Sequence, residues 1–289
     1  MESRPVALAE KIVVTPPASH QSGSGHLDVA RSGARSVVTR AFASSPLRLL
    51  TPKNHGTAAW VFTSTFGGGL VDGDAIRLRV DIGPSANALL ATQAATKVYR
   101  SGGDSRGSTL DLSATIGDDA LLVLAPDPVV CFAGSCYRQR QSFDLQGSAG
   151  LVYVDWLTAG RRARGERWQF ARYSSRVEVR RDGRLEVLDA LTLTPREGDL
   201  PSRMGRFDTL CVIAIAGRSL AKHAAQLVAE VSTLPLAKRA DLVIGASSVS
   251  DGCLIKIAST SVEAVGRTVR EYLAFVPALL GDDPWARKW

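Results

Sequence analysis

Cysteine and histidine are scarce in this sequence. Its 289 residues include only 4 cysteines and 4 histidines. So few cysteines exclude a disulfide-stabilised scaffold of the kind that small secreted domains need. Cys131 and Cys136 have a loose C-x4-C spacing, and neither a second cysteine pair nor a histidine pair at helical spacing accompanies them. The sequence therefore argues against a structural zinc site.

Long apolar runs are also missing. Leu210–Ala216 is one of the longest, and it falls well short of the roughly 18 residues that a membrane-spanning helix needs. Residues 1–11 include 4 charged side chains and no long apolar segment, so we expect no secretory signal and no membrane partner. A cytoplasmic protein with reduced thiols is the resulting expectation.

Two common functional motifs are absent as well. The sequence contains neither a G-x-x-x-x-G-K-[ST] phosphate loop nor an H-E-x-x-H metal motif. The glycine-rich stretch 66–74 precedes an alternating strand, which is typical of a tight turn between strands. The 35 Lys+Arg against 28 Asp+Glu give a net charge of +7, which permits an acidic protein or a nucleic acid as partner.

Strand patterns dominate residues 26–193. In Ile76–Ile82, apolar residues alternate with charged ones, which indicates a strand with one buried and one solvated face. Leu110–Ile116 repeats the alternation, and the apolar run Leu121–Leu124 is typical of a strand buried on both faces. Arg181-Asp182-Gly183 between alternating runs predicts a hairpin. We therefore predict a mainly β fold of stacked sheets, as in a sandwich, a barrel or a solenoid, although no fixed repeat period is visible.

The two ends of the chain differ from this core. Residues 1–25 are rich in Pro, Ser and Gly and are predicted to form a flexible N-terminal arm. Residues 26–207 are predicted to form the β-rich core, and residues 208–289 an α+β part of the same domain. In that last part we predict a strand at Thr209–Ala216, a hairpin at Asp251-Gly252 and about two helices.

Both predicted helices carry end signals. Ser219 is expected to cap the first helix. Residues 260–263 have the sequence T-S-V-E, which fits a capping box at the start of the second helix. Pro277 lies where that second helix should end.

Three isolated acidic residues, Asp127, Asp155 and Glu166, lie in or beside apolar segments. A carboxylate near an apolar core must pair, bind a cation or reach water. Nearby arginines offer the pairing; alternatively, the acids line a polar channel or supply an acid–base pair. One alternative function is therefore a β-scaffold carbohydrate-active enzyme that uses these acids, although aromatic residues, at 6%, are few for sugar stacking.

A second alternative function comes from Arg161–Arg180, where basic residues alternate with Trp168, Phe170 and Tyr173. This composition fits a basic nucleic-acid-binding β module. Aromatic residues that alternate along a strand more often face the core, while the arginines face water. We favour that interpretation and expect no nucleic acid among the partners.

Several sequence blocks together resemble a known family. Residues 67–74 read G-G-G-L-V-D-G-D, and residues 92–101 read T-Q-A-A-T-K-V-Y-R-S. With the segments 45–50, 125–128 and 160–166, they are similar to the urease accessory protein family UreD, also called UreH. The sequence departs from the family pattern at Asp72, which precedes a single glycine, and at Asp127, where the family often has glutamate. Both departures keep the turn or the carboxylate.

The resemblance implies a function without catalysis. Proteins of the UreD family are mostly β, have been described as β-helix-like, and act with UreF and the GTPase UreG to load nickel into urease apoprotein. The resemblance therefore implies UreF, UreG and urease apoprotein as partners, a dimer within the accessory complex, and nickel bound transiently with no tightly bound cofactor. A polar tunnel through such proteins has been proposed as the nickel path.

The resemblance also gives the acidic residues a role. Scattered carboxylates such as Asp127, Asp155 and Glu166 would bind nickel loosely enough to release it. The two glycine-rich and polar blocks would shape the tunnel mouth or the surface that meets a partner, or else would only stabilise the β core. The residues expected at that mouth or surface are Gly68, Gly69, Asp72, Asp74, Gln93, Lys97, Tyr99 and Arg100.

Overall fold

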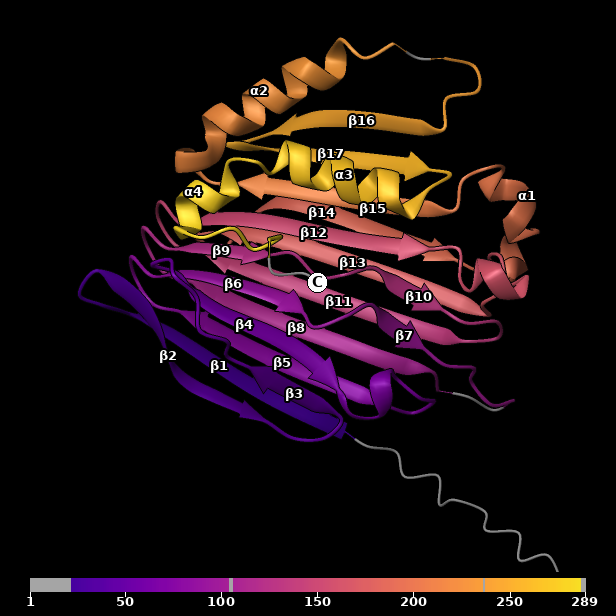
Figure 1. The fold of residues 1–289 in the computed structure, drawn as a ribbon, viewed down its shortest axis with the longest axis horizontal. Helices are drawn as coiled ribbons and strands as arrows, with labels where there is room; N and C mark the ends of the chain where they lie inside the picture. Colours follow the sequence, from indigo (N-terminus) through magenta and orange to yellow (C-terminus); the bar gives the residue numbers. More distant parts are fainter. Residues whose placement is uncertain (1–21, 104–105, 236, 287–289) are drawn as a thin grey trace, which may run out of the picture.

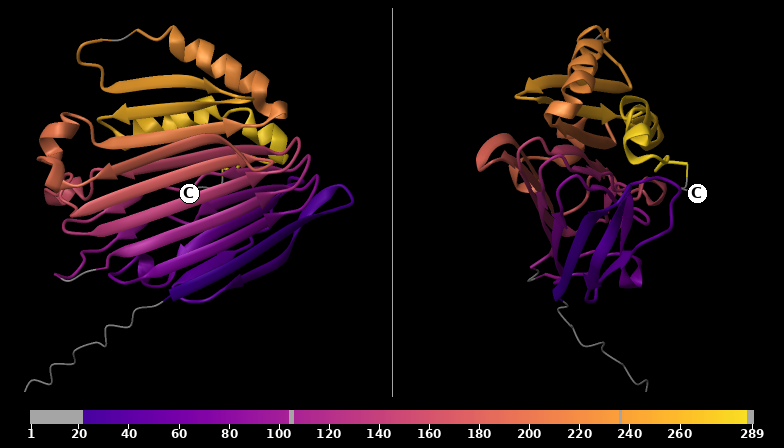
Figure 2. Two further views of the ribbon diagram at one scale, coloured as in Figure 1. Left: turned by 180° about the vertical axis from the view of Figure 1, so that it is seen from behind. Right: turned by 90° about the vertical axis from the view of Figure 1, so that its left-hand side faces the viewer.

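The computed structural model describes residues 22–103, 106–235 and 237–286. Two β-sheets and a group of C-terminal helices form three layers (Figure 1). We call the seven-stranded sheet the outer sheet and the ten-stranded sheet the middle sheet. The helices cover the far side of the middle sheet, and the outer sheet has one face without any helix across it (Figure 2). The predicted mainly β fold of stacked sheets is confirmed.

The outer sheet has the strand order β14-β13-β11-β8-β5-β1-β2. The bounds of its strands are β14 Arg184–Leu193, β13 Arg172–Arg181, β11 Cys136–Leu145, β8 Ser108–Ile116, β5 Ala75–Ile82, β1 Ser22–Ser32 and β2 Arg35–Ala43. Its five inner strands, from β13 to β1, run parallel to one another, and an antiparallel strand, β14 or β2, closes each edge.

The middle sheet has the order β16-β17-β15-β12-β9-β6-β4-β3, with β10 paired to both β12 and β7 beside this path. The bounds of its strands are β16 Leu242–Val249, β17 Gly252–Ser259, β15 Thr209–Ala216, β12 Gly150–Thr158, β9 Leu121–Leu124, β6 Asn87–Thr92, β4 Ala59–Thr65, β3 Leu47–Leu50, β10 Val129–Cys131 and β7 Thr96–Val98. Four of these strands, β4, β6, β9 and β12, run parallel to one another.

From β4 to β13 the chain alternates between the two sheets, so that each coil adds a strand to both (Figure 1). In the middle sheet Ala59 pairs with Ala88, Asn87 with Leu121 and Leu121 with Gly150, at offsets of 29, 34 and 29 residues. This arrangement is a β-helix-like coil of uneven length. The uneven offsets explain why the sequence shows no fixed period.

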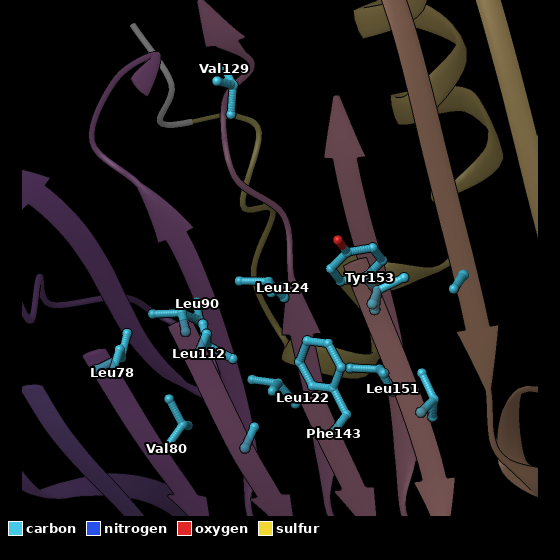
Figure 3. Close-up of a cluster of buried hydrophobic side chains, with 14 of the residues drawn as sticks. Leu78, Val80, Leu90, Leu112, Leu122, Leu124, Val129, Phe143, Leu151 and Tyr153 are labelled. Atoms are coloured by element: carbon cyan, nitrogen blue, oxygen red, sulfur yellow. The ribbon is translucent and has the colours of Figure 1, made fainter. Parts of the chain in front are cut away.

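The main hydrophobic core lies between the two sheets (Figure 3). Strand β5 buries Ile76, Leu78, Val80 and Ile82 there, as its alternation predicts. All four residues of β9 are buried, because one face packs on this core and the other on the helices. Each fully buried aliphatic or aromatic side chain contributes about 1.5–3 kcal/mol to the stability of the fold.

The helices of the last third are α2 Ala221–Ser232, α3 Val262–Tyr272 and the short α4 Val276–Leu280; α1 Leu200–Met204 precedes them. Ser261 caps α3 by accepting a hydrogen bond from the backbone nitrogen of Ala264 at 3.2 Å. The predicted helix start at residues 260–263 is confirmed, but the capping box is not formed: Glu263 accepts from the Ser261 hydroxyl, and the Ser261 backbone nitrogen donates to Ser259. Ser219 does not cap α2, which is a wrong prediction: a 3₁₀ turn at Arg218–Leu220 leads into the helix and its N-terminus has no side-chain cap. Among the described residues no helix is both long and apolar enough to cross a bilayer.

Residues 1–21 of the predicted arm lie outside the described residues, but its last part is ordered. Ser22–Gly25 opens strand β1, with Gly23 and Gly25 buried. A Cβ on Gly25 would lie 2.6 Å from Cδ2 of Leu47 and 2.9 Å from Cδ1 of Leu78. These glycines therefore allow β1 to approach the core closely. The prediction of a flexible arm, which was based on composition, is wrong for this part of the chain.

Candidate functional site: a cavity between the sheets

A cavity of about 140 Å³ lies between the outer and middle sheets. Most of its wall is apolar, and its lining includes the exposed residues Gly68 and Ala94, so the cavity opens at the surface. Its deeper lining includes Gln139 and Asp155, which are 2% and 9% exposed. The cavity is large enough to hold several waters.

Asp127 lies in the lining near the exposed residues, in the loop between β9 and β10. Its Oδ2 accepts a hydrogen bond from the Thr92 hydroxyl at 3.2 Å, and its backbone nitrogen donates to that hydroxyl at 2.7 Å. The carbonyl of the preceding Pro126 accepts a hydrogen bond from Nε1 of Trp156 at 2.8 Å. These contacts fix the Pro-Asp-Pro segment and direct the Asp127 carboxylate along the wall of the cavity.

Asp155 belongs to a buried polar cluster at the inner part of the cavity. Its Oδ2 accepts hydrogen bonds from Nε2 of Gln139 at 2.6 Å, from Oγ of Ser175 at 2.9 Å and from the hydroxyl of Tyr173 at 3.5 Å. Burial raises the pKa of the Asp155 carboxyl above its ordinary value, although these hydrogen bonds oppose the shift. A cation that reached this carboxylate would relieve the cost of burying its charge.

The glutamines of this cluster were missed by sequence analysis. In β11 the residues Tyr137, Gln139, Gln141 and Phe143 all face the core. Gln141 donates from Nε2 to the hydroxyl of Tyr153 at 3.2 Å. The signal was present in the sequence, because extending the alternation of Phe143 backwards places both glutamines on the buried face.

Glu166 does not line the cavity. Arg161 holds its carboxylate with two guanidinium hydrogen bonds, one from Nε at 2.8 Å, and the backbone nitrogen of Ala133 donates to it at 3.1 Å. The Arg161 hydrogen bond is the main cause that lowers the pKa of Glu166. Glu166 is therefore paired with a nearby arginine, which is one of the alternatives expected from the sequence. Its bond to Ala133 connects the loop after β12 to the loop after β10.

The glycine-rich block and the 92–101 block contact each other directly. The backbone nitrogen of Leu70 donates to the carbonyl of Lys97 at 2.8 Å, and the nitrogen of Tyr99 donates to the carbonyl of Leu70 at 2.9 Å. A Cβ on Gly69 would lie 2.6 Å from Cε2 of Tyr99 and 2.7 Å from the Lys97 carbonyl oxygen. Gly69 is therefore buried against Lys97 of strand β7 and against Tyr99, and only glycine fits there.

The two aspartates of the glycine-rich block stabilise loops. Asp74 is 4% exposed and its Oδ2 accepts from the backbone nitrogen of Val71 at 2.9 Å. Burial raises the pKa of Asp74. The carboxylate of Asp72 accepts from the backbone nitrogens of Gly102 and Gly107 at 3.2 and 3.0 Å.

Of the remaining predicted rim residues, only Gly68 is part of the cavity lining. Gln93, Lys97 and Arg100 are exposed, and Gly68 lines the cavity itself. Tyr99 is half-buried, with its ring 5.2 Å from that of Phe132 in an edge-to-face contact. Two large apolar side chains of the same region, Phe66 and Val71, are 52% and 50% exposed.

One group of metal-ligand type side chains, His26, Asp28 and Asp81, lies on the opposite face of the outer sheet. Nε2 of His26 is 2.8 Å from Asp28 and 3.0 Å from Asp81, whereas its Nδ1 is 3.0 Å from a guanidinium nitrogen of Arg40. Arg40 also pairs with Asp28, and Arg79 pairs with Asp81. Two arginines therefore already balance the charge of the two carboxylates, and the group forms a network of ion pairs and hydrogen bonds.

The alternative functions have little support in this geometry. Trp168, Phe170 and Tyr173 are 2%, 1% and 1% exposed, so they offer no stacking surface to a nucleic acid. Of the three acids proposed for sugar chemistry, only Asp127 and Asp155 line the cavity, and Glu166 is bonded to Arg161.

Comparison with known proteins identifies the family. The family model described as "UreD urease accessory protein" matches residues 21–289. The chain belongs to the UreD family. A urease accessory protein UreD of Sorangium cellulosum (strain So ce56) is 51% identical over 270 residues, which cover 93% of this chain and 85% of that protein.

Other UreD relatives span bacteria and plants. The UreD protein of Anaeromyxobacter sp. (strain Fw109-5) is 44% identical over 92% of this chain and 90% of its own length. The urease accessory protein D of Arabidopsis thaliana is 32% identical over 91% of this chain and 99% of its own length. All three relatives are named as accessory proteins, which agrees with the expectation of a non-catalytic role.

Proposed function

We propose that this UreD protein is a non-catalytic maturation factor that bridges urease apoprotein to UreF and UreG and helps nickel reach the urease active site. The observation that carries the proposal is that Asp127 and Asp155, from separate strands and loops, line one cavity that opens at the surface. The first carboxylate is near the opening and the second is deep in the wall, so the proposed path runs from Asp127 to Asp155.

The donor set of the cavity suits an ion that must move on. Ni²⁺ accepts oxygen and nitrogen ligands, and carboxylates bind it less tightly than cysteine or histidine clusters do. The residues that line the cavity include carboxylate, amide and hydroxyl groups, and no cysteine or histidine is among them. An entering ion would exchange part of its hydration shell for these oxygens.

The rim supports the bridging role. The exposed apolar residues Phe66 and Val71 lie in the same block as Gly68, which lines the opening. A partner that covered these apolar groups would also cover the mouth of the cavity. Lys97 and Arg100 add exposed positive charge to this surface, which would fix the orientation of an acidic partner.

Glu166 has a different role in this proposal. Its carboxylate is held by Arg161 and by the backbone of Ala133. We assign to it the positioning of the loop at residues 160–168, and the nickel path to Asp127 and Asp155 alone.

The experiment is co-expression of this protein, as wild type or variant, with a urease operon that lacks its own UreD gene. Asp127→Asn and Asp155→Asn remove one charge each while preserving shape. Asp241→Asn is the matched control, because Asp241 is exposed and outside the cavity. We expect less nickel per urease active site with the first two variants and normal nickel with the third, while pull-down shows an intact complex in each. Normal nickel with both cavity variants would refute the path.

A further inference from the structure

The solvent-facing side of the outer sheet carries a groove of about 660 Å³. The groove lies over strands β1, β5, β8, β11 and β13, on the face opposite the inter-sheet cavity, and no helix crosses this face (Figure 2). We call it the basic groove. The charged residues that line it are Arg77, Arg79, Arg140, Arg176, Asp111 and Glu178.

The strand register places these charges in a row. Arg77 of β5 lies opposite Asp111 of β8, which lies opposite Arg140 of β11, which lies opposite Arg176 of β13. Adjacent strands are about 4.8 Å apart, so Arg140 and Arg176 are direct cross-strand neighbours of like charge. Such pairs are destabilising when nothing lies between them.

The acidic residues of the groove neutralise only some of the arginines. Glu178 accepts from Nε of Arg176 at 2.7 Å, and Asp81 accepts from Nε of Arg79 at 2.7 Å. Within the described part of the chain, the side chains of Arg77 and Arg140 form no salt bridge and no hydrogen bond. Both side chains are exposed. The groove therefore presents two guanidinium groups that lack an ion-pair partner, one on each side of Asp111, whose own carboxylate is 3.9 Å from Arg138.

We propose that the basic groove is a docking site for an acidic segment of a partner protein. Guanidinium groups bind carboxylates in a bidentate manner, and an anionic segment would relieve the repulsion between Arg140 and Arg176. Parallel sheets also usually have both faces covered, whereas the parallel centre of this sheet has one bare face. The inference goes beyond the nickel path, because it concerns the opposite face of the sheet and uses no cavity residue.

An acidic protein segment fits the groove better than a nucleic acid does. No aromatic side chain lines it, so bases would have no stacking surface. Asp111 and Glu178 interrupt the positive charge and would repel a continuous phosphate backbone. Next to the groove, β14 places Leu188 opposite Glu178, and Leu185 and Leu188 are 42% and 48% exposed. Apolar residues of a protein segment would cover these leucines.

Fluorescence anisotropy at low ionic strength tests the proposal with the full-length chain. The probe is a labelled twelve-residue peptide of alternating glutamate and glycine, and the reference probe has glutamine in place of glutamate. The double variant Arg77→Glu/Arg140→Glu reverses the unpaired charges. The control Lys222→Glu/Arg270→Glu makes the same change in net charge at exposed residues of α2 and α3, on the helical side of the molecule (Figure 1).

We expect the glutamate peptide to bind the wild type and the control alike, and to bind the groove variant about tenfold more weakly, because two attractive charges become two repulsive ones. The glutamine peptide should bind none of them. Equal weakening in both double variants, or no binding to the wild type, would overturn the proposal. So would a single-stranded oligothymidine that binds more tightly than the peptide and loses its binding in the groove variant. Thermal melting verifies that each variant is folded.

Discussion

The hydroxyl of Thr92 contacts Asp127 twice, by accepting from its backbone nitrogen at 2.7 Å and by donating to its carboxylate at 3.2 Å. The two residues come from blocks that are 35 positions apart in the sequence. One belongs to the Thr-Gln-Ala-Ala-Thr segment and the other to the Pro-Asp-Pro segment, and both line the cavity. The contact therefore links the two family-specific blocks at the proposed entrance for nickel.

Thr92→Val removes both hydrogen bonds while it keeps the shape of the side chain. We expect a loss of about 1–3 kcal/mol in the free energy of unfolding, because the backbone nitrogen of Asp127 is left without its acceptor. Urea denaturation measures this loss. Thr92→Ser keeps the hydroxyl and should stay close to wild type, so equal destabilisation by both variants would contradict this role of the hydroxyl.

Asp155→Asn should stabilise the protein at neutral pH. The pKa of this carboxyl is raised from 3.8 by burial, so the native state holds the proton to higher pH than the unfolded chain does. The free energy of unfolding therefore falls as the pH rises from the unfolded-state pKa of Asp155 to its higher native-state pKa. Above the native pKa the protein bears the full cost of burying the charged carboxylate. Asparagine has no such penalty.

The measurement for Asp155 is the melting temperature of both proteins across pH 3 to 8. We expect the variant to melt higher at neutral pH, by roughly 2–4 °C for each kcal/mol gained. The advantage should shrink as the pH falls towards 3.8, the value in the unfolded chain. A constant difference at every pH would show that the effect does not come from this ionisation.

Glu166→Gln should have the opposite effect on stability from Asp155→Asn. Arg161 lowers the pKa of Glu166 from 4.5, so the carboxylate contributes stability that is present above pH 4.5 and is lost as the pH falls through the lower native value. The variant should be less stable than wild type at pH 7, and the two should converge in acid. Nickel loading per assembled complex should be unchanged, which distinguishes a positioning residue from an ion ligand.

Gly69→Ala tests the packing of the rim. Its Cβ would meet Cε2 of Tyr99 at 2.6 Å and the carbonyl oxygen of Lys97 at 2.7 Å, so the strand β7 must shift. We expect a loss of about 1–3 kcal/mol, measured by denaturation. Gly245→Ala is the control, because a Cβ there meets nothing within 4 Å. A loss of the same size at both positions would contradict the packing argument.

Local features of the fold were predictable from the sequence, because they depend on near neighbours. The alternation in Ile76–Ile82 gave the buried and solvated faces of β5. The turn at Asp182-Gly183 joins β13 and β14 as a hairpin, with both residues at positive φ. The T-S-V-E segment marks the start of α3, where Ser261 is the N-cap. Each of these depends on fewer than about ten consecutive residues.

Long-range features were not predictable in this way. The contact between Thr92 and Asp127 depends on a coil whose length varies from turn to turn. Gly23 and Gly25 were predicted to lie in a flexible arm, because composition does not show that Leu47 and Leu78 approach the backbone at Gly25 closely. Of the three predicted acids, two share the cavity and Glu166 is paired with Arg161, a distinction that requires the three-dimensional arrangement.

The most direct test of the central claim is to block the cavity without removing a carboxylate. Ala95 lines the cavity, so Ala95→Trp would fill its space, whereas Ala237→Trp adds the same side chain at an exposed loop position. The measurement is nickel per urease active site after co-expression, in complexes verified by pull-down. We predict strongly reduced nickel with Ala95→Trp and normal nickel with Ala237→Trp. Full nickel loading with the blocked cavity in an intact complex would contradict the account.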